Sequence, residues 1–290
     1  LKYSGLAPWE IWLSESQERM VLAIPPEHIA NVQRICEGLN VEGTVIGEFT
    51  GDQMLHLTYE DEEVCNLPMG FIHEGLPQRT MIGTTKTSAF EEPEIALKED
   101  LTEELLGALA HLNVCSKEPI IRQYDHTVQG GAVLYSLTGK TYASPSDAAI
   151  TEIILGSGHG LAVAHGINPI LNRIDPYYGS LWAVLEAVSN MVASGVDPQH
   201  IALIDNFIWP FPDEESLADL DKAVDALVAA SAALRMPFVS GKDSLSSTYR
   251  GEGKILKIPP VVCISAFAKV EDIGKTISSC FKKPGNKIII

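Results

Sequence analysis

Segment 237–247 contains apolar residues, which favour burial, followed directly by charged and polar residues, which favour contact with solvent or a ligand. An apolar run leaves a helical pattern and changes at Gly241 into Lys242, Asp243 and Ser244. Glycine permits a backbone turn that other residues resist. Lysine, aspartate and serine together could hold a phosphate and its Mg²⁺. The segment therefore predicts a buried strand that breaks at Gly241 into a polar turn, and a plain solvated strand end also fits the pattern.

The length of 290 residues predicts about two domains. Hydrophobic residues make up 46% and charged residues 20%, which is typical of globular proteins and allows a large core. The chain does not begin with methionine, and its last residues, 286–290, end in an apolar run. We therefore expect a fragment of a longer protein.

The charge balance is strongly acidic, with a net charge of −17 and a pI near 4.8. Such a chain repels nucleic acid and anionic membranes, and it needs local cations to bind an anionic substrate. The five cysteines are scattered without a C-x-x-C pair, which argues against a disulfide framework and fits a reducing cytoplasm. No apolar run reaches the ~18 residues of a membrane span.

The chain divides by pattern into four stretches. Residues 1–65 read as strand, helix and hairpin, with strands at 21–24, 44–49 and 54–59 and a helix that Pro25 and Pro26 open. A connector with one helix near 101–112 covers 66–118. A second domain covers 119–272, and residues 273–290 begin a further one. The polar loop 14–20, directly before an apolar run, fits either a substrate pocket or a solvated edge.

A glycine-rich segment, 156–160, lies between apolar runs at 153–155 and 161–164. A phosphate-binding loop would be followed by a helix, whereas the residues that follow here are typical of a strand. We therefore predict a β-hairpin at this segment.

The most informative helix is predicted at 179–194. Apolar residues recur on one stripe of it: Leu181, Leu185, Val188 and Val192. Glu186 and Asn190 share a different face, whose neighbours are alanines. A carboxylate and an amide one turn apart could coordinate Mg²⁺. A helix that packs on both sides, with Glu186 in a salt bridge, is the alternative.

Two further elements precede the segment at 237–247. Residues 201–204 predict a strand that ends at Asp205, a position used for ligands in α/β sheets but also common in plain loops. Ser216 then begins a long helix that runs to about Leu234 and that we interpret as packing only.

Four motifs in this order resemble one family: SESQERM at 14–20, QYDHxVQGG at 123–131, the Glu186–Asn190 pair, and VSGKDS at 239–244. They are similar to phosphoribosylformylglycinamidine synthase, the glutamine-dependent amidotransferase of purine biosynthesis. The resemblance implies an α+β fold built from aminoimidazole-ribonucleotide-synthetase-like modules, with mixed sheets packed against helices. By resemblance, 1–65 ends the C-terminal domain of a first module, 119–272 is the N-terminal ATP-binding domain of a second, and 273–290 starts the domain that follows.

The resemblance also implies an activity, an ATP-dependent amidation of formylglycinamide ribonucleotide. A separate glutaminase domain or subunit supplies ammonia, and Mg²⁺ accompanies ATP. The catalytic histidine of the family lies upstream of this chain, so we expect no catalytic residue here. The alternatives are a structural or regulatory nucleotide-binding module, or another ATP-using enzyme of the superfamily, such as selenophosphate synthetase or thiamine-phosphate kinase.

The implied site residues follow by position. The substrate-binding residues are Glu15, Ser16, Gln17 and Ser244; the ATP-binding residues are Asp205, Gly241 and Lys242; and the metal ligands are Asp125, Glu186, Asn190 and Asp243. Of these ligands, Asp125, Glu186 and Asn190 match residues that hold Mg²⁺ at a second, structural nucleotide site in the longer single-chain members of the family. Smaller bacterial members have a metal-binding asparagine where this chain has Lys242. An ammonium cannot bind Mg²⁺, so we expect Lys242 to contact phosphate and Asp243 to take the metal.

Overall fold

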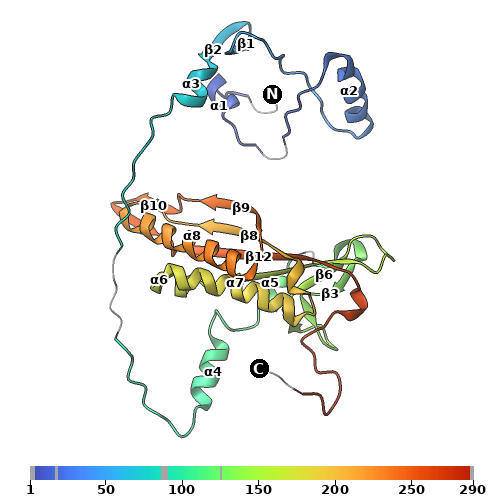
Figure 1. Cartoon of the computed structure of the whole chain (residues 1–290), viewed down its shortest axis with the longest axis vertical. Coiled ribbons are helices and arrows are strands. Elements are labelled where there is room, and N and C mark those ends of the chain that lie inside the picture. The colour runs from blue at the N-terminus through green and yellow to red at the C-terminus, as the bar shows by residue number, and fades with distance from the viewer. Residues whose placement is uncertain (1–3, 17–18, 86–90, 125, 288–290) are drawn as a thin grey trace. The chain divides into compact units, whose positions relative to one another are not determined.

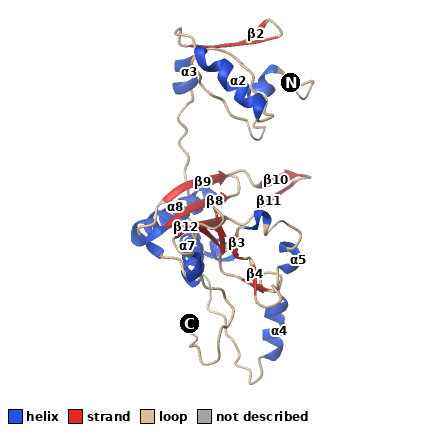
Figure 2. Ribbon diagram, turned by 90° about the vertical axis from the view of Figure 1, so that its right-hand side faces the viewer, coloured by secondary structure: helices blue, strands red, loops and turns tan. Residues whose placement is uncertain are grey.

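The computed structural model describes residues 4–16, 19–85, 91–124 and 126–287. The chain divides into two compact units, Leu1–Thr80 and Met81–Ile290. Figures 1 and 2 show the helices and strands of each unit. Among the described residues, no helix combines the length and the apolar character that a bilayer crossing requires. The boundary between the units falls inside the stretch that we predicted as a connector.

The first unit contains short helices and one two-stranded antiparallel sheet. Its elements are α1 (Pro8–Trp12), η1 (Pro26–His28), α2 (Ile29–Gly38), β1 (Met54–Tyr59), β2 (Glu62–Pro68) and α3 (Met69–Glu74). The predicted strands at 21–24 and 44–49 are wrong, because both segments take irregular structure with exposed apolar side chains, such as Leu22 and Phe49. The strand at 54–59 is confirmed, and its partner is β2.

The second unit carries a six-stranded sheet and two long helices. Its helices are α4 (Thr102–Ala110), α5 (Glu118–Ile121), η2 (Val128–Gly130), α6 (Pro169–Ile174), α7 (Pro176–Ala193), η3 (Pro198–His200), α8 (Glu214–Leu234) and η4 (Ile273–Lys275). Its strands are β3 (Ala132–Leu134), β4 (Leu137–Thr138), β5 (Ser144–Pro145), β6 (Ala149–Glu152), β7 (Gly160–Ile167), β8 (Ile201–Ile208), β9 (Phe238–Ser244), β10 (Thr248–Gly251), β11 (Lys254–Lys257) and β12 (Val261–Val270).

The large sheet has the strand order β3-β6-β7-β12-β8-β9. All of its neighbouring pairs are antiparallel except β8 and β9, which run parallel and are joined through α8. Strands β6 and β7 form the predicted hairpin around the glycine-rich segment, although β6 ends at Glu152, before the predicted 153–155. The Glu152 carboxylate accepts a hydrogen bond from the Gly158 amide at 2.8 Å, which closes the turn.

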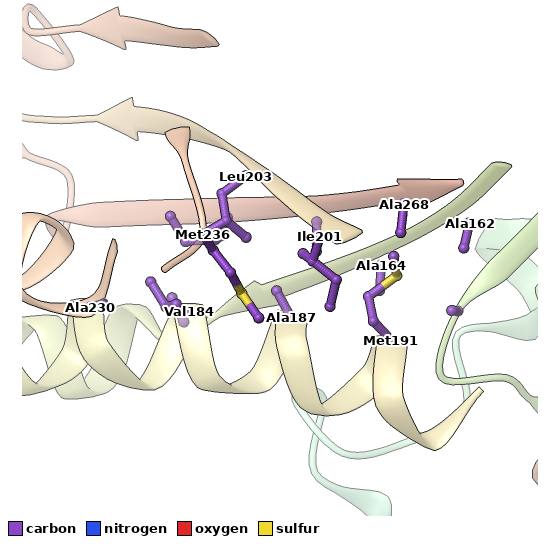
Figure 3. Packing of buried hydrophobic residues seen from close by; sticks show 14 of the residues in the cluster. Ala162, Ala164, Val184, Ala187, Met191, Ile201, Leu203, Ala230, Met236 and Ala268 are labelled. Atoms are coloured by element: carbon purple, nitrogen blue, oxygen red, sulfur yellow. The ribbon is translucent and has the colours of Figure 1, made fainter. Parts of the chain in front are cut away.

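The core lies between one face of this sheet and helices α7 and α8. Alternate residues of β7, β8 and β12 are buried, as expected for a sheet covered on one face. Figure 3 shows Val184, Ala187 and Met191 of α7 between the helix and the strands. The predicted stripe is only half packed: Leu181 and Val188 lie against the core, whereas Leu185 is 54% and Val192 47% exposed.

Small residues decide which face of α7 packs. A Cβ atom on Gly166 of β7 would lie 2.0 Å from the carbonyl oxygen of Ala183, so only glycine permits this approach. Alanines at 183 and 187 complete the contact and are fully buried. The alanines of α7 therefore let the backbone of β7 come close to the helix.

Three predicted boundaries change in this unit. Asp205 lies inside β8 rather than at its end, and Gly241 to Ser244 continue β9 rather than forming a turn. In both places, hydrogen bonding between the parallel strands keeps the backbone extended past the point where the apolar residues stop. The cap of α8 is Asp213, whose carboxylate accepts from the amide of Ser216 at 3.1 Å, and not Ser216 itself.

Candidate functional site

The parallel pair β8–β9 places Asp205 directly beside Gly241. A Cβ atom on Gly241 would lie only 2.4 Å from Oδ1 of Asp205, so the carboxylate occupies the space of the missing side chain. Burial raises the pKa of Asp205, and the negative charge of Asp243 raises it further. The two carboxylates lie on one face, and burial and like charge both raise the pKa of Asp205. A cation bound between them would stabilise their ionised forms.

Alternation along β9 separates the predicted ligands into two sets. Successive strand side chains point to opposite faces, so Asp243 shares the face of Asp205, and Lys242 and Ser244 share the other. The Lys242 ammonium donates to Oγ of Ser244 at 2.8 Å, which agrees with this assignment. The structure therefore brings Lys242 and Ser244 together, and separately Asp205 with Gly241 and Asp243.

The loops that leave the parallel pair are bonded to one another. The amide of Trp209 donates to the carbonyl of Ser244 at 2.7 Å, and the amide of Ser247 donates back to the carbonyl of Trp209 at 3.1 Å. Thr248 accepts from the amide of Phe211 at 2.8 Å. The sequence gives no distinctive signal for Thr248, which is a threonine at the start of a polar hairpin.

Glu186 and Asn190 both bind the end of β7. The Glu186 carboxylate accepts from the amide of Ile167 at 2.7 Å, and the Asn190 side chain donates to the carbonyl of His165 at 3.0 Å. Burial raises the pKa of the Cys263 thiol, and the charge of Glu186 adds to that effect. The two predicted metal ligands thus lie one turn apart, as expected, and each is already fixed by a backbone group.

The metal ligands that we predicted for two separate sites lie apart among the described residues. Asp125 lies outside them. Asp243 is on β9, three strands away from β7, which corresponds to about 14 Å at the usual strand spacing. Within the described part of the chain, no group of three His, Cys, Asp or Glu side chains could hold a metal ion. One ion cannot therefore bind both Asp243 and the Glu186–Asn190 pair.

Asp243, which we predicted as a metal ligand, shares a face with Asp205, which we predicted as an ATP-binding residue, and the chemistry of the two side chains fits Mg²⁺. Both offer hard carboxylate oxygens, which are the ligands that Mg²⁺ takes when its other positions are filled by water and phosphate. The placement of both carboxylates on one face of the parallel pair supports this fit.

The predicted substrate loop belongs to the first unit. Glu15 and Ser16 are exposed, and Gln17 lies outside the described residues. Ser14 and Ser16 share a hydrogen bond of 2.9 Å between their hydroxyls. The Arg19 guanidinium donates to the carbonyl oxygens of Ser14 and Ser16. The Glu15 side chain is open to solvent.

Comparison with protein families identifies two domains. A model described as FGAR-AT PurM_N-like domain matches residues 116–269, and a model described as AIR synthase related protein, C-terminal domain, matches residues 2–60. Together with the mixed sheet and its one-sided helices, these matches define the class, which is that of AIR synthase-like α/β domains. Within that class, the chain belongs to the FGAR-AT PurM_N-like family.

Two curated relatives carry the name phosphoribosylformylglycinamidine synthase subunit PurL. The protein from Picrophilus torridus is 30% identical over 296 residues, which cover 100% of this chain and 38% of the relative. The protein from Methanocaldococcus jannaschii is 34% identical over 272 residues, which cover 93% of this chain and 36% of the relative. The chain therefore spans well under half the length of these relatives.

Solved structures agree with the family. The PurLQS structure from Thermotoga maritima has a TM-score of 0.68 and 25% identity to this chain. The match covers 95% of this chain and 42% of the Thermotoga chain. PurL of Thermotoga maritima in complex with FGAR has a TM-score of 0.66 and 25% identity to this chain. The match covers 93% of this chain and 39% of that PurL chain. A third PurL structure of that organism is complexed with ATP.

Proposed function

We propose that the chain is part of the ATP-dependent synthetase that converts formylglycinamide ribonucleotide to formylglycinamidine ribonucleotide in purine biosynthesis. Membership of the FGAR-AT PurM_N-like family supports this proposal, as do the names of relatives that extend over the whole chain. The observation that carries it is the Asp205–Gly241 contact, with Asp243 on the same face. This contact occurs where the family resemblance implies ATP binding.

The reaction needs an activated amide, because an amide oxygen is a poor leaving group. Transfer of the γ-phosphoryl group breaks its bond to ADP and forms a bond to the amide oxygen. Ammonia then attacks the amide carbon, and phosphate leaves with that oxygen. Such transfer depends on position and charge more than on covalent help from the protein.

The chain's own residues have distinct tasks in this proposal. Asp205 and Asp243 would hold Mg²⁺, which would neutralise charge on the nucleotide phosphates. Gly241 keeps the space that the Asp205 carboxylate occupies. Lys242 binds a phosphate oxygen while Ser244, its hydrogen-bond partner, orients the substrate.

Residues outside β8 and β9 complete the proposal. Glu15, Ser16 and Gln17, in the first unit, match the substrate-binding residues of the family. Asp125, Glu186 and Asn190 belong to a second, structural nucleotide site, in which Glu186 and Asn190 also anchor α7 to β7. A glutaminase partner supplies ammonia from glutamine, and we place the protein in the cytoplasm.

The test is turnover by the complete protein. Asp205→Asn and Asp243→Asn should each lower FGAR-dependent release of ADP at least tenfold. Asp221→Asn, an equal change on the exposed face of α8, should leave the rate as it is. The proposal fails if both variants amidate FGAR at the normal rate, or if the complete protein does not bind Mg-ATP.

A further inference from the structure

The hairpin of β10 and β11 leaves the sheet at the carboxyl end of β9. Strand β9 ends at Ser244, and β10 begins at Thr248 and pairs antiparallel with β11. Ligands of α/β sheets bind beyond the carboxyl ends of parallel strands. The hairpin therefore starts at the end of the sheet where Lys242 and Ser244 lie.

One face of this hairpin is attached to the loop that follows β8. Thr248, Arg250 and Lys257 share that face, because every second residue of a strand points to the same side. Thr248 accepts a hydrogen bond from the amide of Phe211 at 2.8 Å, and Lys257 forms an ion pair with Asp213. The guanidinium carbon of Arg250 lies 5.1 Å from the centroid of the Phe211 ring. Three contacts thus fix the position of the hairpin.

Lys257 has an acidic partner, whereas Arg250 has none. Within the described part of the chain, the Arg250 side chain forms no ion pair and no hydrogen bond, and its contact is the Phe211 ring. The chain has 38 Asp and Glu residues, yet none of the described ones pairs with this arginine. The ring supports one face of the guanidinium, so the five N–H groups, which lie in its plane, remain for a ligand.

Positive charge gathers on this hairpin, although the chain as a whole is acidic. Segment 248–257 has one acid and three cations, which are Arg250, Lys254 and Lys257, whereas the net charge of the chain is −17. An acidic protein needs local cations of this kind to bind an anionic ligand. The hairpin therefore favours an anion next to the end of β9.

The loop that contacts Arg250 is also bonded to Ser244. Phe211 comes two residues after Trp209, whose amide donates to the carbonyl of Ser244 at 2.7 Å. Two residues span at most about 7 Å, so the Phe211 amide lies within about 10 Å of that carbonyl. Arg250 is therefore positioned beside the end of β9 rather than on a remote surface.

We propose that Arg250 binds a phosphate group of a substrate, while the Phe211 ring holds its guanidinium in position. A guanidinium offers two parallel N–H groups, which match two oxygens of a phosphate. The inference rests on the proposed function and extends it, because both phosphorylated substrates of that reaction, FGAR and ATP, supply such a group. Arg250 lies outside the four sequence motifs, the last of which ends at Ser244.

The test is steady-state kinetics of the complete protein, with FGAR and ATP varied in turn. Arg250→Gln should raise the KM of one of these substrates about tenfold, which corresponds to one lost charge-assisted hydrogen bond, and leave kcat nearly unchanged. A rise for FGAR assigns Arg250 to the ribose phosphate of that substrate. A rise for ATP assigns it to a phosphate of the nucleotide.

Two further variants separate the guanidinium from the attachment and the charge of the hairpin. Arg250→Lys keeps the charge but not the paired N–H groups, so it should raise the same KM by a smaller factor. Lys257→Gln removes one positive charge and one attachment from the same face and leaves Arg250 in place, so it should change neither KM.

The inference is wrong if Arg250→Gln leaves both KM values as they are, or raises both equally. It is also wrong if Lys257→Gln has the same effect as Arg250→Gln, because loss of charge or attachment would then explain both. In each of these cases, turnover by the wild type leaves the proposed function standing. Absence of FGAR-dependent ADP release by the wild type would instead refute the proposed function, and this inference with it.

Discussion

The Asp205 carboxylate lies in the space that a side chain at position 241 would fill, with Oδ1 2.4 Å from the place of the missing Cβ. Glycine at this position is therefore a requirement of the carboxylate next to it rather than of a turn. The backbone of β9 is extended here, so the residue is not needed for an unusual φ angle.

Gly241→Ala should displace the Asp205 carboxylate and weaken Mg-ATP binding at least tenfold, while the strand itself remains formed. The expected reason is steric, since a real Cβ does not approach within 3.0 Å of another atom. Calorimetry with Mg-ATP and circular dichroism on the complete protein measure the two effects. Gly107→Ala is the control, because a Cβ there meets open space. Equal nucleotide affinity in Gly241→Ala and wild type would contradict this prediction.

Asp205→Asn should make the protein more stable at pH 7 while it loses Mg-ATP binding. The pKa of Asp205 is raised in the folded state, so the fold favours the protonated form, and ionisation destabilises it as pH rises through that pKa. The gain in melting temperature should vanish below about pH 4, where the carboxyl is protonated in both states. An unchanged or lower melting temperature of Asp205→Asn at pH 7 would argue against the burial of this charge.

Asp213 should stabilise the start of α8 in two separable ways. Asp213→Ala removes the cap and should cost about 1 kcal/mol, whereas Asp213→Asn keeps a capping oxygen and loses only the ion pair with Lys257. Lys257 and the Ser216 amide lower the pKa of Asp213 to about 2. This stabilisation is thus complete above about pH 4 and is lost as pH falls toward 2. Denaturant unfolding of both variants checks the order, which fails if Asp213→Asn is the less stable.

Glu186→Gln separates anchoring from metal binding. Glutamine can still accept the hydrogen bond from Ile167 but carries no charge, whereas Glu186→Ala leaves that amide without its acceptor, at a cost of about 1–3 kcal/mol. We expect near-normal stability for Glu186→Gln and reduced Mg-nucleotide binding at the second site. Thermal unfolding and Mg-ADP titration provide the readouts. Normal Mg-ADP binding by Glu186→Gln would leave Glu186 with an anchoring role only.

Gly166→Ala should destabilise the second unit by about 3 kcal/mol, because the added Cβ would meet the backbone of Ala183, which cannot rotate away as a side chain can. Unfolding in urea measures the loss. Gly107→Ala again provides the comparison, and similar stability of the two variants would show that α7 has room to move off the sheet.

Sequence patterns predicted the long helices and the main strands well, because 3.6-residue and two-residue periods are local properties. These patterns failed where hydrogen bonding to a neighbouring strand decides where a strand ends. Asp205 and Gly241 look like the end of a strand and the start of a turn, yet the parallel pairing extends both strands past them. Strands predicted at 21–24 and 44–49 are absent from these described segments, since apolar composition alone does not supply a partner strand.

In the candidate site too, the sequence predicted the residue types but not their arrangement in space. The residue types pointed to Asp205, Asp243 and Lys242, but alternation along β9 places Lys242 on the opposite face from the two carboxylates. That fact depends on an extended backbone at 241–244, which the glycine in the sequence argued against. Glu186 and Asn190 were correctly placed one turn apart, whereas their bonds to β7 arise from tertiary packing that has no local signal.

The bonded loops at the end of the parallel pair give the protein an optical reporter. Trp209 is fully buried and its indole donates to the carbonyl of Ser216, while Trp9, Trp12 and Trp182 are each more than half exposed. An iodide quencher therefore suppresses emission from the exposed indoles and leaves that of Trp209. Because the Trp209 amide is bonded to Ser244, the remaining blue-shifted fluorescence follows what happens at Ser244 without any added label.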